Sequence, residues 1–162
     1  MKLIPLTRGE FAMVDDEDLH LVMSLHWQCH IDPKNGRKYA VTTLYNPKRT
    51  VSMHRLILEH DLDHTDHHDG NGLNNQKENI RPATRTQNGQ NRQLQVHSAK
   101  FKGVQLDKRT GHNWYSRIRI AGKLKHLGYF NSPVEAAKAY DVAALDNFGA
   151  FARTNKELGL YV

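Results

Sequence analysis

Residues 113–149, NWYSRIRIAGKLKHLGYFNSPVEAAKAYDVAALDNFG, predict two strands and a helix in immediate succession. In the run WYSRIRI, successive side chains point to opposite faces of a strand. One face would hold Ser116, Ile118 and Ile120, and the other Tyr115, Arg117 and Arg119. LKHLGYF and, upstream, FKGVQL are similar strand-like runs joined by the short connections DKRTGH and AGK. Short connections favour antiparallel pairing, so we expect a three-stranded antiparallel sheet.

A capped helix follows this sheet in the sequence. Ser132 is a good N-cap, Pro133 suits the first helical position, and Glu135 completes a capping box. Gly149 is expected to end the helix. The apolar positions recur at helical spacing and form one face, made of Ala137, Tyr140, Ala144 and Phe148. Packing of this face on the apolar side of the sheet would leave the arginine-bearing side open.

The net charge of the 162-residue chain is +6, and its distribution is uneven. Residues 1–97 contain 12 Lys and Arg and 12 Asp and Glu, whereas residues 98–162 contain 11 and 5. The whole positive excess therefore lies in the last part of the chain. A basic segment attached to a neutral one is typical of a protein that binds a polyanion through one part. A basic surface kept for solubility would have the same composition.

Composition favours a soluble globular protein of the cytoplasm. A hydrophobic fraction of 38% and a charged fraction of 25% are ordinary for that class. No apolar run approaches the roughly 20 residues needed to cross a bilayer, and the N-terminus MKLIPLTRGEF lacks the apolar core of a signal peptide. The single cysteine, Cys29, excludes an internal disulfide and a thiolate metal cluster. We expect a cytoplasmic location and no membrane partner.

The first part of the chain predicts a small α+β segment. The Asn35-Gly36 pair lies between two apolar and aromatic runs, HWQCHI and KYAVTTLY, and is a strong hairpin signal. The other expected elements are a strand at residues 10–14, a helix over VDDEDLHLVMSL and a short helix over residues 51–60. Residues 85–100 are polar and predict a short helix and then a linker, with a domain boundary near residue 97.

Residues 63–88, DHTDHHDGNGLNNQKENIRPATRTQN, concentrate histidine, aspartate and asparagine. Such a stretch is a metal site, a catalytic site or a solvated loop, because Asx residues and glycine also form turns. Structural zinc is disfavoured, since no cysteine lies nearby and asparagine is a poor zinc ligand. Phosphodiester hydrolysis needs a base that titrates near neutral pH and a hard cation held by oxygen ligands. His67, the neighbouring Asp66 and a later asparagine could supply that set.

The segment DHHDGNGLNNQKENIRPATRTQN, with MHRLIL upstream, resembles the HNH endonuclease motif of phage homing endonucleases. The resemblance implies a ββα-metal fold, with a core motif over residues 51–93 and one Mg²⁺ or Mn²⁺ ion. The implied roles are a general base at His67, a bracing side chain at Asn79, metal ligands at Asp66 and Asn88, and phosphate contacts at His54 and Arg55. His68 competes with His67 as the base, and Asn91 competes with Asn88 as the ligand. His54 could equally be a packed histidine.

Five landmarks of the last part of the chain, KGV, WYSRIRI, HLGYF, EAAKAYDVAAL and FGAFARTN, fall in order within residues 98–156. This pattern resembles the APETALA-two/ethylene-response-factor DNA-binding domain, which implies a three-stranded sheet in the major groove of DNA and a helix behind it. By position, the DNA contacts are Lys102, Gln105, Tyr115, Arg117, Arg119 and His126, with Arg109 and Lys123 as phosphate candidates. Gln105 and Asp107 stand where that family usually has arginine, so the target sequence should differ. On the third strand, alternation does not decide between Lys125 and His126.

Together the two halves predict a site-directed DNA endonuclease. Residues 1–97 would be the HNH endonuclease domain, with an N-terminal α+β wing, and residues 98–162 the domain that brings it to double-stranded DNA. We expect a phage-encoded homing enzyme in a bacterial host cell, with one divalent metal ion and no organic cofactor. The alternatives are a non-catalytic DNA-binding regulator with a structural HNH-like segment, and a nuclease for branched DNA or RNA. The target sequence, the number of strands cut and the oligomeric state stay open.

Overall fold

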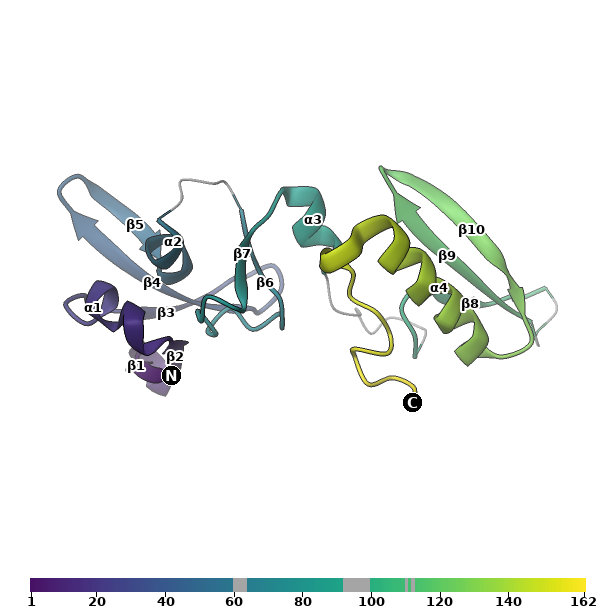
Figure 1. The fold of residues 1–162 in the computed structure, drawn as a ribbon, viewed down its shortest axis with the longest axis horizontal. Helices are drawn as coiled ribbons and strands as arrows, with labels where there is room; N and C mark the ends of the chain where they lie inside the picture. The colour runs from purple at the N-terminus through teal and green to yellow at the C-terminus, as the bar shows by residue number, and fades with distance from the viewer. Residues whose placement is uncertain (60–63, 92–99, 110, 112) are drawn as a thin grey trace. The chain divides into compact units, whose positions relative to one another are not determined.

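Two compact units make up the chain, Met1–Asn88 and Gly89–Val162. The computed structural model describes residues 1–162 with the exception of 60–63, 92–99, 110 and 112. Each unit contains helices and antiparallel strands, so the predicted α+β class is confirmed (Figure 1). The domain boundary predicted near residue 97 lies outside the described residues.

Small antiparallel sheets form the framework of the first unit. Its strands are β1 (Lys2–Pro5) with β2 (Phe11–Val14), β3 (Gln28–Ile31) with β4 (Lys38–Tyr45) and β5 (Lys48–Ser52), and β6 (Thr65–His67) with β7 (Ile80–Pro82). The hairpin predicted at Asn35-Gly36 is confirmed, because β3 pairs with β4 and Gly36 adopts a φ of +71° in the turn. Asp32 stabilises this turn by accepting from the backbone N–H of Lys34 at 2.8 Å.

Short helices accompany these sheets, and η2, α1 and α2 each contribute buried residues. The helices are η1 (Thr7–Gly9), η2 (Asp16–Asp18), α1 (Leu19–Val22), α2 (Met53–Leu58) and α3 (Arg85–Gln90), which runs across the boundary into the second unit. Val14, Val22 and Met53 are fully buried at the centre of this core. The helix predicted over residues 51–60 begins only at Met53, because the residues before it extend the sheet as β5.

The HNH-like segment folds as β6, a loop, β7 and then α3 (Figure 1). β6 and β7 pair in a register that places Asp66 opposite Arg81 and His67 opposite Ile80. The loop between them is bound to β2, because Met13 donates its backbone N–H to the carbonyl of Leu73 at 2.8 Å and accepts from Asn75 at 2.8 Å. The order of two strands and a short helix is therefore present, and it is anchored to the N-terminal sheet.

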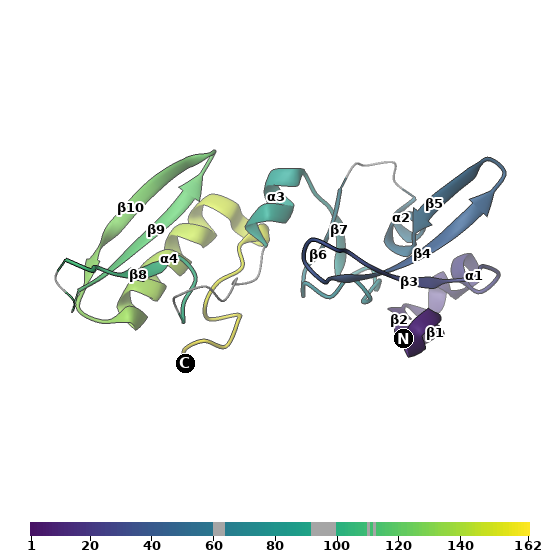
Figure 2. The same cartoon turned by 180° about the vertical axis from the view of Figure 1, so that it is seen from behind.

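A three-stranded antiparallel sheet and one long helix form the second unit. Its elements are β8 (Val104–Leu106), β9 (Trp114–Ile120), β10 (Lys123–Phe130), α4 (Pro133–Phe148) and η3 (Gly149–Phe151). The strand order is β10-β9-β8, and α4 covers one face of the sheet, as Figure 2 shows from behind. The predicted cap is confirmed, since the Ser132 hydroxyl accepts from the backbone N–H of Glu135 at 3.1 Å and Gly149 ends the helix.

The side of the sheet that meets α4 is the side predicted from the alternation in WYSRIRI. Ser116 and Ile118 are buried, with exposures of 0% and 2%, and Arg119 on the other face is exposed. Tyr140 of α4 packs close to the backbone at Gly103, where a Cβ atom would lie 2.0 Å from the tyrosine ring. Only glycine fits this contact, so the backbone can pass directly beside the Tyr140 ring just before β8 begins.

A buried carboxylate holds the C-terminal residues against α4. Asp141 accepts through Oδ1 from the backbone N–H and the side-chain amide of Asn155, both at 2.8 Å. Its Oδ2 accepts from the backbone N–H of Lys156 at 3.0 Å and from the Tyr161 hydroxyl at 2.7 Å. Burial raises the pKa of Tyr161 to about 12, and the bond to Asp141 adds to that shift. Residues 155–161 are thus tied to the helix by charge-assisted hydrogen bonds.

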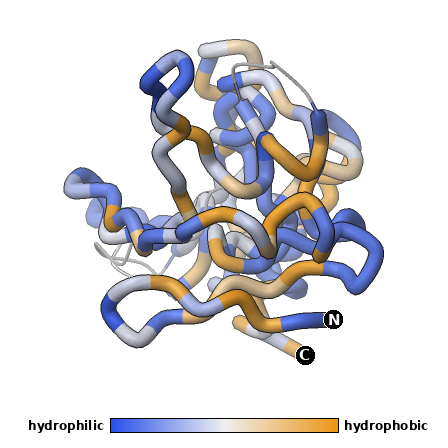
Figure 3. The backbone as a smooth tube through the Cα atoms, turned by 90° about the vertical axis from the view of Figure 1, so that its left-hand side faces the viewer, coloured by the Kyte–Doolittle hydropathy of each residue, from blue (hydrophilic) through white to orange (hydrophobic). Residues whose placement is uncertain are grey.

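Hydrophobic segments along the backbone are short and alternate with hydrophilic ones (Figure 3). Among the described residues, no helix combines the length and the apolar character that a membrane span requires.

Candidate nucleic-acid interface

The face of the second-unit sheet opposite α4 carries polar, basic and aromatic side chains in register. Gln105, Tyr115 and Tyr129 are consecutive partners across β8, β9 and β10. Two residues further along β9, Arg117 pairs with His126. Cross-strand partners share a face, so these residues lie on one surface.

A bulge in β10 determines whether Lys125 or His126 lies on that surface. The register shifts between His126 and Gly128, so Leu127 has no partner on β9. Such an extra residue reverses the alternation beyond it. His126 lies opposite Arg117, while Lys125 lies opposite the buried Ile118. The pairing therefore places His126 rather than Lys125 beside the arginines, a choice that alternation could not make.

Three rings gather at the centre of this face. The rings of Tyr115 and His126 are stacked, with centroids 5.9 Å apart and planes at 19°. Tyr129 lies with its centroid 4.8 Å from His126 and 6.2 Å from Tyr115. The Tyr115 hydroxyl donates to Oε1 of Gln105 at 2.5 Å, which orients that amide. The result is an ordered and partly exposed aromatic cluster.

Arginine side chains surround the cluster. The guanidinium carbon of Arg117 lies 5.8 Å from the centre of the Tyr115 ring, a cation–π distance. Arg119 donates from Nη1 to the carbonyl of Gly122 at 2.7 Å and is therefore held at the β9–β10 turn. Lys123, the first residue of β10, is exposed, but it pairs with Ile120 and so lies on the side of the sheet that meets α4. Arg117 and Arg119 give the open face the character of an anion-binding surface.

Arg109 lies at the turn after β8 and is paired with Asp107. Its Nε lies 3.3 Å from Oδ1 of Asp107, and its Nη2 lies 3.3 Å from Oδ2. The hydrogen bonds from Arg109 hold the pKa of Asp107 below its usual value, and those to Asp107 raise the pKa of Arg109. Nη2 also donates to the Tyr129 hydroxyl at 3.3 Å, which links the turn to the aromatic cluster.

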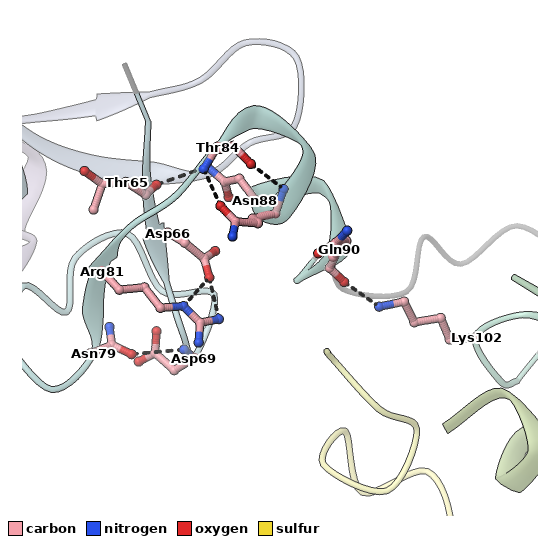
Figure 4. A network of polar contacts seen from close by, with 10 residues as sticks. Thr65, Asp66, Asp69, Asn79, Arg81, Thr84, Asn88, Gln90 and Lys102 are labelled. Atoms are coloured by element: carbon pink, nitrogen blue, oxygen red, sulfur yellow. Dashed lines mark hydrogen bonds and ion pairs between the residues drawn. The ribbon is translucent and has the colours of Figure 1, made fainter. Parts of the chain in front are cut away.

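Lys102, predicted to contact DNA, has its ammonium held inside the second unit. Nζ donates to the carbonyl of Gln90 at 3.1 Å (Figure 4) and to that of Arg153 at 3.0 Å. It also lies 5.8 Å from the centre of the Tyr140 ring. Burial lowers the pKa of Lys102 to about 8. The structure thus gives this lysine a role in packing, and the predicted DNA contact stays a prediction.

In the first unit, the structure places Asp66 against Arg81. Asp66 is buried, and its Oδ2 accepts from Nε of Arg81 at 2.9 Å and from Nη2 at 2.7 Å (Figure 4). Antiparallel pairing of β6 with β7 makes the two residues direct neighbours. Arg81 was not singled out in the sequence, because its importance depends on that register. The signal was its place as the last residue of ENIR.

His67 is buried beside two other rings. Its centroid lies 5.1 Å from that of His54 and 6.1 Å from that of Tyr39. Burial lowers the pKa of His67, while its hydrogen bond to Asn75, at 3.3 Å between Nε2 and Oδ1, opposes that shift. Burial also lowers the pKa of His54 to about 3. The structure brings His54 and His67 together as buried rings in edge contact.

The asparagines of the segment support the loop. Asn79 accepts from the backbone N–H of Asp69 at 3.0 Å through Oδ1 and donates from Nδ2 to the Asn74 carbonyl at 2.7 Å. These bonds connect two parts of the loop, and the bracing role predicted for Asn79 stays a prediction. Asn88 donates from Nδ2 to the carbonyl of Thr65 at 3.0 Å, which ties α3 to β6 (Figure 4). Asn75, not predicted as important, is fully buried and donates to the Leu73 carbonyl at 3.2 Å.

Two other candidates lie in the first unit: Arg55 is exposed on α2, and His68 is exposed just after β6. Asn91, the alternative metal ligand, belongs to the second unit and is buried. Among the described residues, no three His, Cys, Asp or Glu side chains form a group that could hold a metal ion.

Comparison with known proteins links the chain to a transcription factor. The sequence is 41% identical over 66 residues to the "Ethylene-responsive transcription factor WRI1" of Arabidopsis thaliana. The match covers 40% of this chain and 15% of that protein, so the chain spans a small part of the length of this relative. No protein-family model matches the sequence. The similarity supports the predicted APETALA-two-like domain and gives no support to the HNH endonuclease part.

The prediction that the chain is an enzyme is wrong. The finding that overturns it is the similarity to a transcription factor, a class of protein that works without catalysis. Catalytic roles for His67 and Asn79 are therefore not proposed. In the structure His67 is packed among rings, and both ends of the Asn79 amide are engaged within the loop.

Proposed function

We propose that this chain is a non-catalytic DNA-binding protein whose second unit binds double-stranded DNA. The observation that carries the proposal is the face of the β8–β9–β10 sheet opposite α4, where arginines surround an ordered aromatic cluster. The similarity to a transcription factor supports DNA as the partner. The concentration of positive charge in residues 98–162 supports an electrostatic contribution to binding.

The proposed geometry places the sheet in the major groove. That groove is about 12 Å wide and admits a β-ribbon or a small sheet. Arg117 and Arg119 would contact bases or phosphates from β9. Gln105, Tyr115 and His126 would contact base edges at the centre. α4 would stay on the far side of the sheet as its support.

The HNH-like segment of the first unit is proposed to be structural. Its two strands and helix follow the order implied by the ββα-metal class, but its polar side chains stabilise the loop itself. The Asp66–Arg81 pair joins β6 to β7, and Asn79 closes the loop between them. The first unit would then be a stable partner domain for the DNA-binding unit, in the cytoplasm of a bacterial host cell.

Binding of one Mg²⁺ or Mn²⁺ ion by Asp66 and Asn88 stays a separate proposal. A carboxylate and an amide oxygen suit such a cation, but Arg81 would have to leave Oδ2 of Asp66. Calorimetric titration of Mg²⁺ into the wild type, Asp66→Asn and Glu78→Gln tests it. Heat lost only in Asp66→Asn would support the site, and equal heats in all three proteins would refute it.

The DNA-binding proposal is tested by fluorescence anisotropy with a labelled random-sequence duplex over a range of salt concentrations. Arg119→Ala should weaken binding and reduce the slope of log K against log salt by about 0.9 if this arginine neutralises one phosphate. Lys138→Ala, on α4, removes the same charge from the opposite layer and should change little. Equal weakening by both variants, or no binding by the wild type, would refute the proposed face.

A further inference from the structure

The outer face of the β1–β2 hairpin carries exposed apolar side chains. Leu3 pairs with Met13 and Pro5 pairs with Phe11, so these four side chains share one face of the hairpin. Leu3 and Phe11 are 55% and 52% exposed. The alternate residues, such as Ile4, point the other way and are buried in the core of the first unit. The hairpin is therefore apolar on both faces, and the outer one is open to a partner.

A groove extends this apolar surface beside β1. Its volume is about 590 Å³, and its lining includes Pro5, Val22, Met23 and Trp27. Pro5 belongs to both the groove and the hairpin face, so the two apolar surfaces are continuous. Met23 is 69% exposed at the groove. Exposed apolar residues that stand singly are common on proteins, but a contiguous apolar patch marks an interaction site.

The composition of this surface favours a second copy of the chain as its partner. The four side chains of the hairpin face carry no charge, whereas a polyanion is bound by clustered Lys and Arg. Residues 1–97 contain 12 basic and 12 acidic residues, so two copies of the first unit do not repel one another. A stable dimer buries about 800 Å² per partner. Two four-residue strands offer less than that, so the interface needs the groove as well.

The turn end of the hairpin is positively charged. Arg8 lies exposed in η1, which joins β1 to β2. Glu10 at the same end is already paired with Lys38, at 2.5 Å between Oε1 and Nζ. The exposed guanidinium of Arg8 therefore gives this end an excess of one positive charge.

The open end of the hairpin is acidic. Four consecutive carboxylates follow β2, at residues 15–18, and they outnumber the amino group of the chain, Lys2 and Lys77 beside them. Asp16 is bound to the amino group through Oδ1 at 2.7 Å, and its side chain is 64% exposed. A carboxylate has two oxygens that accept hydrogen bonds, so Asp16 can meet a further positive group.

We propose that two copies of this chain associate through the outer face of the β1–β2 hairpin and its groove. A two-fold axis that runs across the strands would place the turn end of each hairpin over the open end of the other. Arg8 of one copy then faces Asp16 of the other, and Phe11 packs against Met13. Such complementary charges fix the orientation of two surfaces more than their affinity. The inference concerns the first unit alone and does not depend on DNA binding.

Sedimentation velocity of the full-length chain without DNA, over a range of protein concentrations, tests this interface. The wild type should shift from monomer to dimer as the concentration rises. Phe11→Glu and Leu3→Glu should weaken the dimer about 10-fold or more, because each would bury an unpaired carboxylate. Both positions are more than half exposed in one copy, so the unfolding midpoints should stay close to that of the wild type. Val142→Glu makes the same change at a 60% exposed residue of α4 and should dimerise like the wild type.

Exchange of charge tests the antiparallel arrangement of the two hairpins. Arg8→Asp and Asp16→Arg should each weaken the dimer, because each places like charges opposite one another. The double variant restores an opposite pair across the interface and should dimerise more tightly than either single variant. Losses that add up in the double variant would overturn the arrangement.

The outcomes separate this interface from the proposed DNA binding. A wild type that stays monomeric at every concentration would overturn the interface, whatever the chain does with DNA. A dimer that Phe11→Glu and Leu3→Glu leave intact would overturn it too, as would one that Val142→Glu weakens to the same extent. A failure of the proposed DNA binding would leave these results unchanged, because no DNA is present.

Discussion

The imidazole of His126 stacks on the phenol of Tyr115, with the planes of the two rings 19° apart. The two residues lie on diagonal positions of neighbouring strands, because Tyr115 pairs with Tyr129 and His126 pairs with Arg117. Arg117 in turn lies 5.8 Å from the Tyr115 ring. Tyr115 is therefore the residue around which the aromatic and basic groups of this face are organised.

Tyr115→Ala is expected to weaken DNA binding about 5- to 150-fold. Its ring contributes a cation–π contact and an aromatic pair, each of about 0.5–1.5 kcal/mol. Tyr115→Phe keeps both and should remain close to the wild type. Fluorescence anisotropy at fixed salt measures the dissociation constants, with Tyr45→Ala in the first unit as the control. Equal losses in Tyr115→Phe and Tyr115→Ala would assign the effect to the hydroxyl and its bond to Gln105.

Local periodicity predicted the second unit well, because its elements are built from short-range signals. The cap at Ser132 and the buried face through Ser116 and Ile118 both follow from spacing within a few residues. The bulge at Leu127 could not be predicted, since an unpaired residue is visible only once both strands are aligned. Strand β5 was missed for a related reason, because its charged and exposed residues lack an apolar alternation.

The first unit shows why residue types alone did not decide its chemistry. Asp66 could bind a metal ion or form an ion pair. His67 could act as a base or pack as a buried ring. The choice depends on Arg81 and His54, which the fold brings to them from distant positions in the sequence. Lys102 of the second unit is a similar case, because its ammonium donates to the carbonyls of Gln90 and Arg153. Sequence reasoning identified the polar cluster, and tertiary contacts decide its role.

Arg81→Met is expected to destabilise the first unit by about 3–5 kcal/mol. The substitution leaves the carboxylate of Asp66, whose side chain is 3% exposed, without its charged partner. Asp66→Asn combined with Arg81→Met removes the uncompensated charge and should recover a large part of that loss. Urea unfolding of the two single variants and the double variant gives the coupling energy. Strict additivity of the two single effects would contradict a pair that acts as a unit.

The stability of the chain is expected to fall as the pH drops from 6.5 towards 3. Burial lowers the pKa of His54 from 6.5 to about 3, so the unfolded chain binds a proton at higher pH than the folded chain. The stability from this residue is complete above pH 6.5 and is lost by up to about 1.4 kcal/mol per pH unit below it. The lowered pKa of His67 acts in the same direction.

Urea midpoints at pH 7 and pH 5 measure this dependence. His54→Gln should be less stable than the wild type at pH 7, because a packed ring is lost, but it should lose less stability between the two pH values. His30→Gln changes an exposed histidine of β3 and should follow the wild type. Identical pH dependence in His54→Gln and the wild type would show that other groups control acid sensitivity.

Asp141→Ala is expected to release residues 155–161 from α4. The substitution leaves the buried backbone and side-chain N–H groups of Asn155 without their acceptor. Two buried unsatisfied donors cost about 2–6 kcal/mol together, so the segment should open locally before the sheet unfolds. Hydrogen exchange would report this as faster exchange at Asn155 and Lys156, with β9 protected. Asp146→Ala, on the exposed side of the same helix, is the matched control, and equal exchange in both variants would disprove the clamp.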